Sequence, residues 1–256
     1  MSEPIADARL ALACLDLTSL NDGDDEAAID RLCTQAIGPA GRGWPAAVCV
    51  WPHRVATARA TLPAAIRVAA VANFPAGALD TAGALRDTGR IVDAGGDEVD
   101  LVLPWRALQA GDASGAAALV RAVRAASAGR TLKLIVESGE LGSDALIDAA
   151  CAIGLDAGVD FLKTSTGKTP HGASPAAAAR MLRAIAGHAR RDAVGFKASG
   201  EVRTVADAAA YIALARTILG EAALTPQRLR FGASGLLDDI EAILAGMPAA
   251  PRPCAY

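Results

Sequence analysis

The chain has 256 residues, a length that suits one (β/α)8 barrel and is too short for two full-sized catalytic domains. Apolar residues make up 52% of it and charged residues 21%, so a large core is available and extensive disorder is excluded. The net charge is −3 and no segment concentrates Lys and Arg, so we expect no binding to nucleic acid or to an anionic membrane. No apolar run reaches the roughly 18 residues that a membrane-spanning helix needs.

The cysteines and the N-terminal segment indicate a compartment. Five cysteines are scattered along the chain, which is typical of free thiols in a reducing environment and not of a disulfide framework. The first residues lack the basic region of a signal peptide. We therefore expect a cytoplasmic protein.

Short aliphatic runs alternate with helical patterns along the whole chain. The predicted strands are 12–16, 46–51, 66–73, 98–103, 132–137, 159–163, 193–197 and 229–233. The clearest of the helical stretches between them are 80–94, 144–157 and 205–219. From Asp16 to Gly232 the runs recur about every 31 residues, the length of a strand–helix repeat. This pattern predicts an α/β fold, a single (β/α)8 TIM barrel over residues 1–256, with a mobile tail at 249–256.

A doubly wound open sheet is the alternative arrangement of the same elements. The glycine-rich dinucleotide fingerprint expected after its first strand is absent from the sequence. No linker or low-complexity tract divides the chain, so we expect one domain.

Polar residues stand at the ends of the predicted strands, where barrel enzymes carry their catalytic groups. These residues are Asp16, Thr18, Asn73, Asp100, Glu137, Lys163 and Lys197. Alternation along a strand places Lys163 on the same face as Phe161, and Lys197 on the same face as Gly195. Any one of them could be a solvated loop residue, but their convergence predicts a polar site at the barrel mouth.

Only four of the 25 basic residues are lysines, namely Lys133, Lys163, Lys168 and Lys197. A buried lysine can lose its proton near neutral pH and arginine cannot, so the lysines are candidates for amine chemistry or phosphate contacts. Lys163 and Lys197 should end adjacent strands about 5 Å apart. Mutual repulsion and burial should lower one pKa by several units, and the neutral amine could form a Schiff base with a carbonyl. The alternative is that each lysine only pairs with Asp100 or Asp16.

The two aspartates suit proton transfer, and the chemistry needs neither a metal nor a cofactor. Asp16 and Asp100 could act because converting an iminium into an enamine removes a carbon-bound proton, and forming an alcohol delivers one. The three histidines have no ligand spacing and no two cysteines are close in sequence, so we expect no metal site.

Two loops have the composition of an anion site. Residues 166–169 follow the sixth predicted strand, and residues 231–235 lead from the eighth into a helix whose first N–H groups can bind phosphate. The run 167–169 (GKT) resembles a P-loop, but Leu162 replaces the first glycine of that motif, so we reject nucleotide binding.

Six segments resemble the 2-deoxyribose-5-phosphate aldolase family, in the same order and over nearly the whole chain. They are LDLTSLN (15–21), VANFPAG (71–77), DEVDLV (97–102), DFLKTSTGK (160–168), GFK (195–197) and RFGAS (230–234). The resemblance implies a class I aldolase without a cofactor. Such an enzyme reversibly splits 2-deoxy-D-ribose 5-phosphate into acetaldehyde and D-glyceraldehyde 3-phosphate. The expected partners are these small molecules, with a homodimer as the assembly considered.

The same resemblance implies roles for single residues. Lys163 matches the family's Schiff-base lysine, Lys197 the lysine that perturbs it, and Asp100 the carboxylate of the proton relay. Asp16 and Thr18 match residues that contact the substrate hydroxyl. The positions around the phosphate are Gly167, Lys168, Gly200, Arg203, Gly232 and Ser234. Further candidate substrate-binding residues are Asn21, Cys49, Asn73, Thr166, Glu201 and Gly235.

Two residues have two interpretations each. Cys49 is either a small core residue or a thiol exposed to unsaturated aldehydes, which would inactivate the enzyme slowly. Tyr256 is either a frayed chain end or, as the resemblance implies, a terminal tyrosine that reaches the site and assists proton transfer. We favour the core interpretation for the cysteine and the catalytic one for the tyrosine.

The chain departs from the family pattern near the expected phosphate. Glu201 follows Gly200 where the family usually has two consecutive glycines, and Gly235 follows Ser234 where it usually has two serines. The alternative function is therefore the same Schiff-base chemistry on non-phosphorylated aldehydes or deoxy sugars. A catalytically silent sugar-phosphate binder is a third hypothesis, against which the intact lysine pair and aspartate argue.

Overall fold

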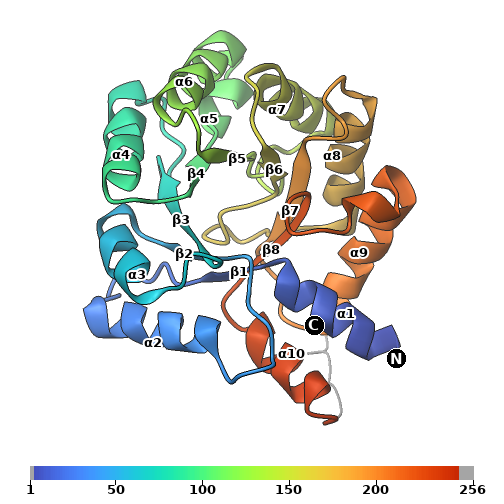
Figure 1. The fold of residues 1–256 in the computed structure, drawn as a ribbon. Helices are drawn as coiled ribbons and strands as arrows, with labels where there is room; N and C mark the ends of the chain where they lie inside the picture. The colour runs from blue at the N-terminus through green and yellow to red at the C-terminus, as the bar shows by residue number, and fades with distance from the viewer. Residues whose placement is uncertain (1–2, 248–256) are drawn as a thin grey trace.

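The computed structural model describes residues 3–247, and they form a closed barrel of eight parallel strands surrounded by helices (Figure 1). The strands pair in chain order, and β8 closes the barrel by pairing with β1. The predicted (β/α)8 barrel is thereby confirmed, and the open sheet is excluded. No helix within residues 3–247 is long and apolar enough to cross a membrane.

The predicted strands are found close to their expected positions. They are β1 Leu15–Thr18, β2 Ala47–Val50, β3 Arg67–Ala72, β4 Glu98–Val102, β5 Thr131–Ile135, β6 Phe161–Lys163, β7 Gly195–Ser199 and β8 Leu229–Ala233. The first prediction is wrong at its start, because Leu12 belongs to the helix α1 (Glu3–Ala13). The apolar residues there are buried as one face of α1, which packs against α9 and α10.

Helices follow the strands, and short polar side chains cap several of them. They are α2 Glu26–Ile37, α3 Val55–Thr61, α4 Thr81–Asp93, α5 Trp105–Gln109, α6 Ala113–Ala126, α7 Asp144–Asp156, α8 Pro175–Gly187, α9 Val205–Leu219 and α10 Leu236–Leu244, with 3-10 turns at Pro52–Arg54 and Glu221–Ala223. Ser143, Ser174 and Thr204 each accept a hydrogen bond from a backbone N–H in the first turn of the helix that follows. The three helices predicted from periodicity are confirmed as α4, α7 and α9.

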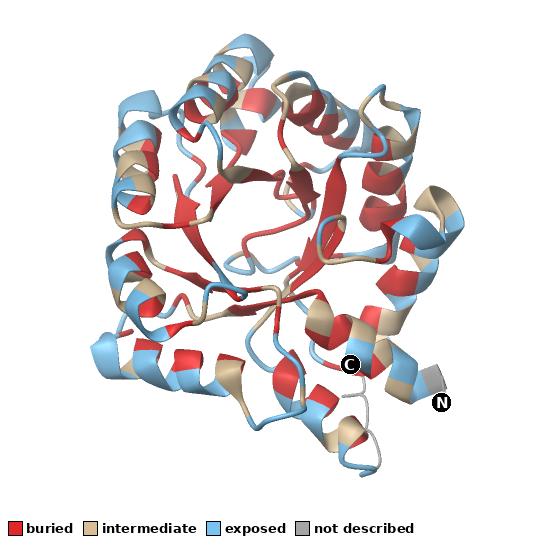
Figure 2. Ribbon diagram, in the orientation of Figure 1, coloured by how far each residue is buried: buried red, intermediate tan, exposed pale blue. Residues whose placement is uncertain are grey.

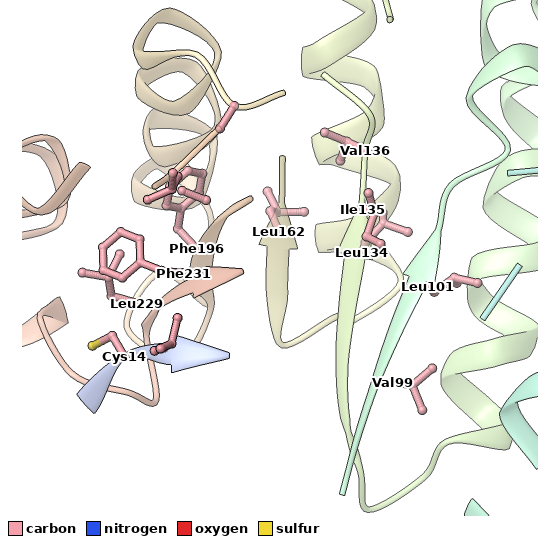
Figure 3. Close-up of a cluster of buried hydrophobic side chains, with 14 of the residues drawn as sticks. Cys14, Val99, Leu101, Leu134, Ile135, Val136, Leu162, Phe196, Leu229 and Phe231 are labelled. Atoms are coloured by element: carbon pink, nitrogen blue, oxygen red, sulfur yellow. The ribbon is translucent and has the colours of Figure 1, made fainter. Parts of the chain in front are cut away.

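Alternation along the strands separates an outer core from the barrel interior. Val99 and Leu101 of β4, Leu162 of β6 and Phe196 of β7 are fully buried in the apolar cluster between sheet and helices (Figure 3). The strands and the inward faces of the helices are buried, whereas the outer helix faces are exposed (Figure 2). The intervening strand positions carry charged side chains into the barrel.

One side of the interior is apolar and the other is charged. A separate small cluster comes from the end of β1 and from β2 and β3, and consists of Leu20, Ala47, Cys49, Ala69 and Val71. The charged residues come from β1, β4, β5, β6, β7 and β8. The apolar side needs no polar partner, so the ionic contacts gather on the remaining strands.

Gly195 permits a close contact at the base of the charged side. A Cβ at this position would lie 2.3 Å from Cε1 of Phe161, which is closer than real Cβ contacts. The Phe161 ring in turn lies beneath the guanidinium of Arg230, 5.5 Å from the ring centroid. Gly195 therefore determines the position of the Phe161 ring and, through it, that of the Arg230 guanidinium.

Gly195→Ala should lower the free energy of unfolding by about 1–3 kcal/mol, because overpacking displaces the Phe161 ring. Urea denaturation measures the change. The control is Gly89→Ala in α4, where a Cβ meets nothing within 4 Å and stability should rise by up to about 1 kcal/mol. Wild-type stability in Gly195→Ala would contradict this account of the contact.

Candidate active site

A cavity of about 340 Å³ opens at the carboxyl ends of β1, β6, β7 and β8. Twelve of the predicted site residues line it: Thr18, Asn21, Lys163, Thr166, Gly167, Lys168, Gly200, Glu201, Arg203, Gly232, Ser234 and Gly235. Ser19, Leu20, Ser199, Val202 and Ala233 line it as well, although the sequence did not single them out. The structure thus brings together loops that lie far apart in the chain.

Lys163 links this cavity to the charged barrel interior. It is the last residue of β6, only 3% exposed, and its Nζ donates to Oδ2 of Asp100 over 2.8 Å. Burial lowers the pKa of Lys163 below its ordinary value. Asp100 opposes this effect and Lys197 adds to it. The amine that faces the cavity is therefore the one from which the surroundings favour removing a proton.

Lys197 has the opposite character. Its Nζ lies 2.5 Å from Oδ2 of Asp16 and 2.8 Å from Oδ2 of Asp100. Burial alone would lower its pKa, but these two carboxylates outweigh burial and raise it. One lysine pKa falls, as expected, but burial is a larger cause than repulsion within the pair. Both lysines also make the ion pairs that were considered as the alternative.

Three further charged residues complete the interior: Lys133, which the sequence had selected only as one of four candidate lysines, and Glu98 and Arg230, to which it gave no role. Lys133 places its Nζ 2.5 Å from Oε2 of Glu98, 2.8 Å from Oδ1 of Asp100 and 3.1 Å from Oδ2 of Asp16. Arg230 donates to Oδ1 of Asp16 over 2.5 Å and to Oε1 of Glu98 over 2.9 Å. The rarity of lysine had already selected Lys133, and alternation along β4 places Glu98 on the same face as Asp100.

These contacts form one buried network of seven residues, with more cations than anions. Its members are Asp16, Glu98, Asp100, Lys133, Lys163, Lys197 and Arg230. Three carboxylates thus face four basic groups, and an uncompensated buried charge is costly. The surroundings raise the pKa values of Lys133, Lys197 and Arg230 and lower that of Lys163. Loss of one proton from Lys163 makes the network neutral.

Asp16 and Asp100 lie beneath the cavity floor and do not line it. Burial would raise their pKa values, but the surrounding cations outweigh burial and hold both well below the ordinary range. The oxygens of Asp16 are occupied by Lys133, Lys197 and Arg230. Direct contact between Asp16 and a substrate hydroxyl, as the resemblance implied, is therefore not what this geometry provides. Thr18, two residues further on, does line the cavity.

Backbone conformation shapes the side of the cavity formed by the loops after β6 and β7. The buried carboxylate of Glu137 accepts a hydrogen bond from the backbone N–H of Thr166 over 3.1 Å. A Cβ on Gly200 would lie 2.9 Å from Cα of Gly172, so glycine is required there. Glu201, next in the chain, is exposed and has a φ of 65°, a left-handed conformation that is unfavourable for glutamate.

The last side of the cavity combines a glycine and a helix start. A Cβ on Gly232 would lie 2.9 Å from Cε of Lys197, so a larger residue would push this lysine away. Gly235 caps α10 and supplies no side-chain acceptor to the first turn of that helix. N–H groups at such a helix start favour an anion.

Two predicted residues lie away from the cavity. Cys49 is fully buried in the apolar cluster, and burial raises the pKa of its thiol, which matches the core interpretation. The side-chain amide of Asn73 donates to the carbonyls of Ala78 and Val102, so it organises the turn after β3. Tyr256 and the tail 249–256 lie outside the described residues. Residues 3–247 contain no group of three His, Cys, Asp or Glu side chains that could hold a metal ion.

Fold and site together define a class, the barrel enzymes that can act on a carbonyl compound through a buried amine. The family model of the DeoC/LacD family aldolases matches residues 10–239. The deoxyribose-phosphate aldolase of Agrobacterium fabrum is 43% identical over 259 residues, covering 100% of this chain and 98% of that protein. The chain belongs to the DeoC/LacD aldolase family.

Solved structures agree on the fold. A Coccidioides immitis protein assigned as a deoxyribose-phosphate aldolase is 27% identical with a TM-score of 0.78, covering 91% of this chain and 86% of that chain. A Toxoplasma gondii protein with the same assignment has a TM-score of 0.87 at 23% identity, covering 95% of this chain and 96% of that chain. A tetrameric deoxyribose phosphate aldolase from Aeropyrum pernix has a TM-score of 0.70 at 20% identity, covering 94% and 98%.

Asp16→Asn should destabilise the protein by about 3–5 kcal/mol at pH 7, because it leaves buried cations uncompensated. The folded-state pKa of Asp16 is lowered, so its contribution is present above the unfolded value of about 3.9 and is lost as the pH falls below it. Urea titrations of the wild type and Asp16→Asn should therefore show a smaller difference in the free energy of unfolding in acid than at pH 7.

The matched control is Asp22→Asn, an exposed position in the loop after β1, which should change stability by less than about 0.5 kcal/mol. An Asp16→Asn variant no less stable than this control would show that the buried network does not depend on the Asp16 charge.

Proposed function

We propose that the protein is a class I aldolase that reversibly cleaves 2-deoxy-D-ribose 5-phosphate into acetaldehyde and D-glyceraldehyde 3-phosphate. The observation that carries this proposal is the position of Lys163. Among the seven residues of the buried network it alone lines the cavity, and its pKa is lowered. The Agrobacterium fabrum relative, named for this reaction, supports the choice of substrate.

In the proposed reaction the neutral amine of Lys163 attacks the aldehyde carbon of the open-chain sugar, and loss of water gives an iminium. The hydroxyl on the third carbon then loses its proton, and the bond between the second and third carbons breaks. Its electrons move into the iminium to give an enamine, and glyceraldehyde 3-phosphate leaves. Protonation at carbon and hydrolysis of the resulting iminium release acetaldehyde and restore the amine.

The neighbours of Lys163 suit these charge changes. Iminium formation places a positive charge 2.8 Å from Asp100, whose carboxylate compensates it. Lys197 contacts the same carboxylate oxygen and is held protonated, so a cation remains beside Asp100. That Lys197 and Asp100 also relay protons is a prediction from the resemblance. Tyr256 remains a predicted proton-transfer residue, on the resemblance alone.

Three loops suit the phosphate group. Residues 166–168, 200–203 and 232–235 surround the outer part of the cavity, and Lys168 and Arg203 add positive charge. The start of α10 adds backbone N–H groups. We further propose a homodimer in the cytoplasm, and the buried free thiols of the four described cysteines are compatible with a reducing compartment.

Borohydride reduction in the presence of acetaldehyde, followed by peptide mass mapping, tests the proposal. The expected product is an N-ethyl group on Lys163. Lys163→Arg keeps the positive charge but should lose both the adduct and essentially all turnover, because guanidinium cannot form the imine. An adduct on another lysine, or none, would overturn the mechanism.

The alternative function, the same chemistry on non-phosphorylated substrates, is not favoured by the relatives, which are named for deoxyribose phosphate. The position of Glu201 nevertheless bears on how strongly a phosphate group binds. This carboxylate lines the cavity beside Arg203 and is exposed to solvent. At about 4 Å in bulk water, repulsion from one phosphate charge costs about 1 kcal/mol, or roughly fivefold in binding.

Glu201→Gly should therefore raise kcat/KM for deoxyribose 5-phosphate by up to about fivefold and leave that for deoxyribose unchanged. Glu201→Gln is the matched control, because it removes the charge but keeps a side chain at the positive φ. If Gln reproduces the effect of Gly, charge is the cause; if only Gly does, the backbone is. Equal changes for both substrates would show that Glu201 does not set the phosphate preference.

A further inference from the structure

Two members of the buried network lie away from the cavity. Glu98 is the first residue of β4 and Arg230 the second of β8, and both are nearly inaccessible to solvent. They hydrogen-bond to each other over 2.9 and 3.3 Å, and neither lines the cavity. A substrate held at the barrel mouth therefore does not touch them.

The pair is nevertheless connected to the residues at the mouth. Arg230 donates to Oδ1 of Asp16, whose other oxygen contacts Lys197. Glu98 contacts Lys133, which also contacts Asp100. Both paths continue to Lys163, since Asp100 contacts it directly and also binds Lys197. A change of charge at Glu98 or Arg230 therefore alters the electrostatic potential at the amine of Lys163, because few solvent molecules screen the buried charges between them.

The charge count of the network makes the sign of this effect specific. Three carboxylates face four basic groups, so one excess proton is unfavourable, and Lys163 is the member best placed to lose it. Removing Arg230 would leave three of each, and a protonated Lys163 would then be fully compensated. Removing Glu98 would instead leave two excess cations and disfavour that proton further.

We propose that Glu98 and Arg230 are positioning residues that determine the protonation of Lys163 from beneath the active site, by holding the network at one cation more than its carboxylates. This inference rests on the proposed function, in which the neutral amine is the nucleophile. The pair itself is neutral as a unit. Removing both residues together therefore leaves the network with one more cation than carboxylates, as in the wild type.

Other ionisable groups around Lys163 are unchanged in the test. The groups that interact with it are Asp100 from β4, Lys197 from β7, Cys49 from β2 and, beyond β5, Glu137. Lys133, Asp16 and Arg230 are linked to it through Asp100 and Lys197. The thiol of Cys49 is kept neutral by burial. Burial also raises the pKa of Glu137, whose carboxylate binds the Thr166 N–H.

The experiment compares four proteins, namely the wild type, Glu98→Gln, Arg230→Met and the double variant, by the pH dependence of kcat/KM for deoxyribose 5-phosphate. On the acidic side of this profile kcat/KM rises as Lys163 loses its proton. The midpoint of that rise should move to higher pH in Arg230→Met and to lower pH in Glu98→Gln, by about one pH unit each. In the double variant it should return to the wild-type position. A purely structural role would lower stability in all three variants without this ordering.

The proposal would be overturned if this midpoint did not shift in either single variant, or if it did not return to the wild-type pH in the double variant. Competitive labelling with acetic anhydride, read at Lys163 by mass spectrometry, measures the same proton without turnover. It keeps the test decisive if the wild type proves inactive on this substrate, which would count against the proposed function instead. If Arg230→Met does not fold, Arg230→Gln replaces it alone and in the double variant; if neither folds, the shift in Glu98→Gln decides.

Discussion

The interior of this barrel must hold four basic side chains against three carboxylates, all of them nearly inaccessible to solvent. Among the described residues, the ion pairs that join these seven side chains connect six of the eight strands. The carboxylates raise the pKa values of Lys133, Lys197 and Arg230, whereas burial, to which Lys197 adds, lowers the pKa of Lys163. Two glycines make room for side chains in and beneath this network. Gly195 makes room for the Phe161 ring beneath Arg230, and Gly232 makes room for the stem of Lys197.

Different parts of the barrel carry the apolar contacts, the ionic contacts and the loops around the cavity. An apolar cluster from β2, β3 and the end of β1 fills one side, so the ionic contacts are confined to the other. Of the seven network residues only Lys163 lines the cavity, and the other six lie beneath it. Loops then add what the strands cannot provide, namely backbone N–H groups and exposed charges that suit a phosphate. Glu201 belongs to these loops, and the amine belongs to a strand.

Most of the fold and part of the site could be predicted from the sequence. The spacing of aliphatic runs was sufficient for eight strands, and alternation along β6 and β7 placed Lys163 and Lys197 inward. The partner of Arg230 was not predictable, because β8 and β4 face each other across the interior only when the sheet closes into a barrel. For the same reason Cys49 and Asn73, both near strand ends, could not be excluded from the cavity. Their burial and hydrogen bonding depend on neighbours distant in sequence.

The central claim is that Lys163 is the amine of the buried network that loses its proton most readily, and an NMR titration tests it most directly. The chain has only four lysines, so labelling their ε-carbons with ¹³C gives four signals, which Lys→Arg variants assign. The account predicts that the Lys163 signal titrates below the ordinary lysine value of 10.5, while those of Lys133 and Lys197 titrate above it. A Lys163 signal that titrates at or above 10.5, or Lys197 titrating below Lys163, would contradict it.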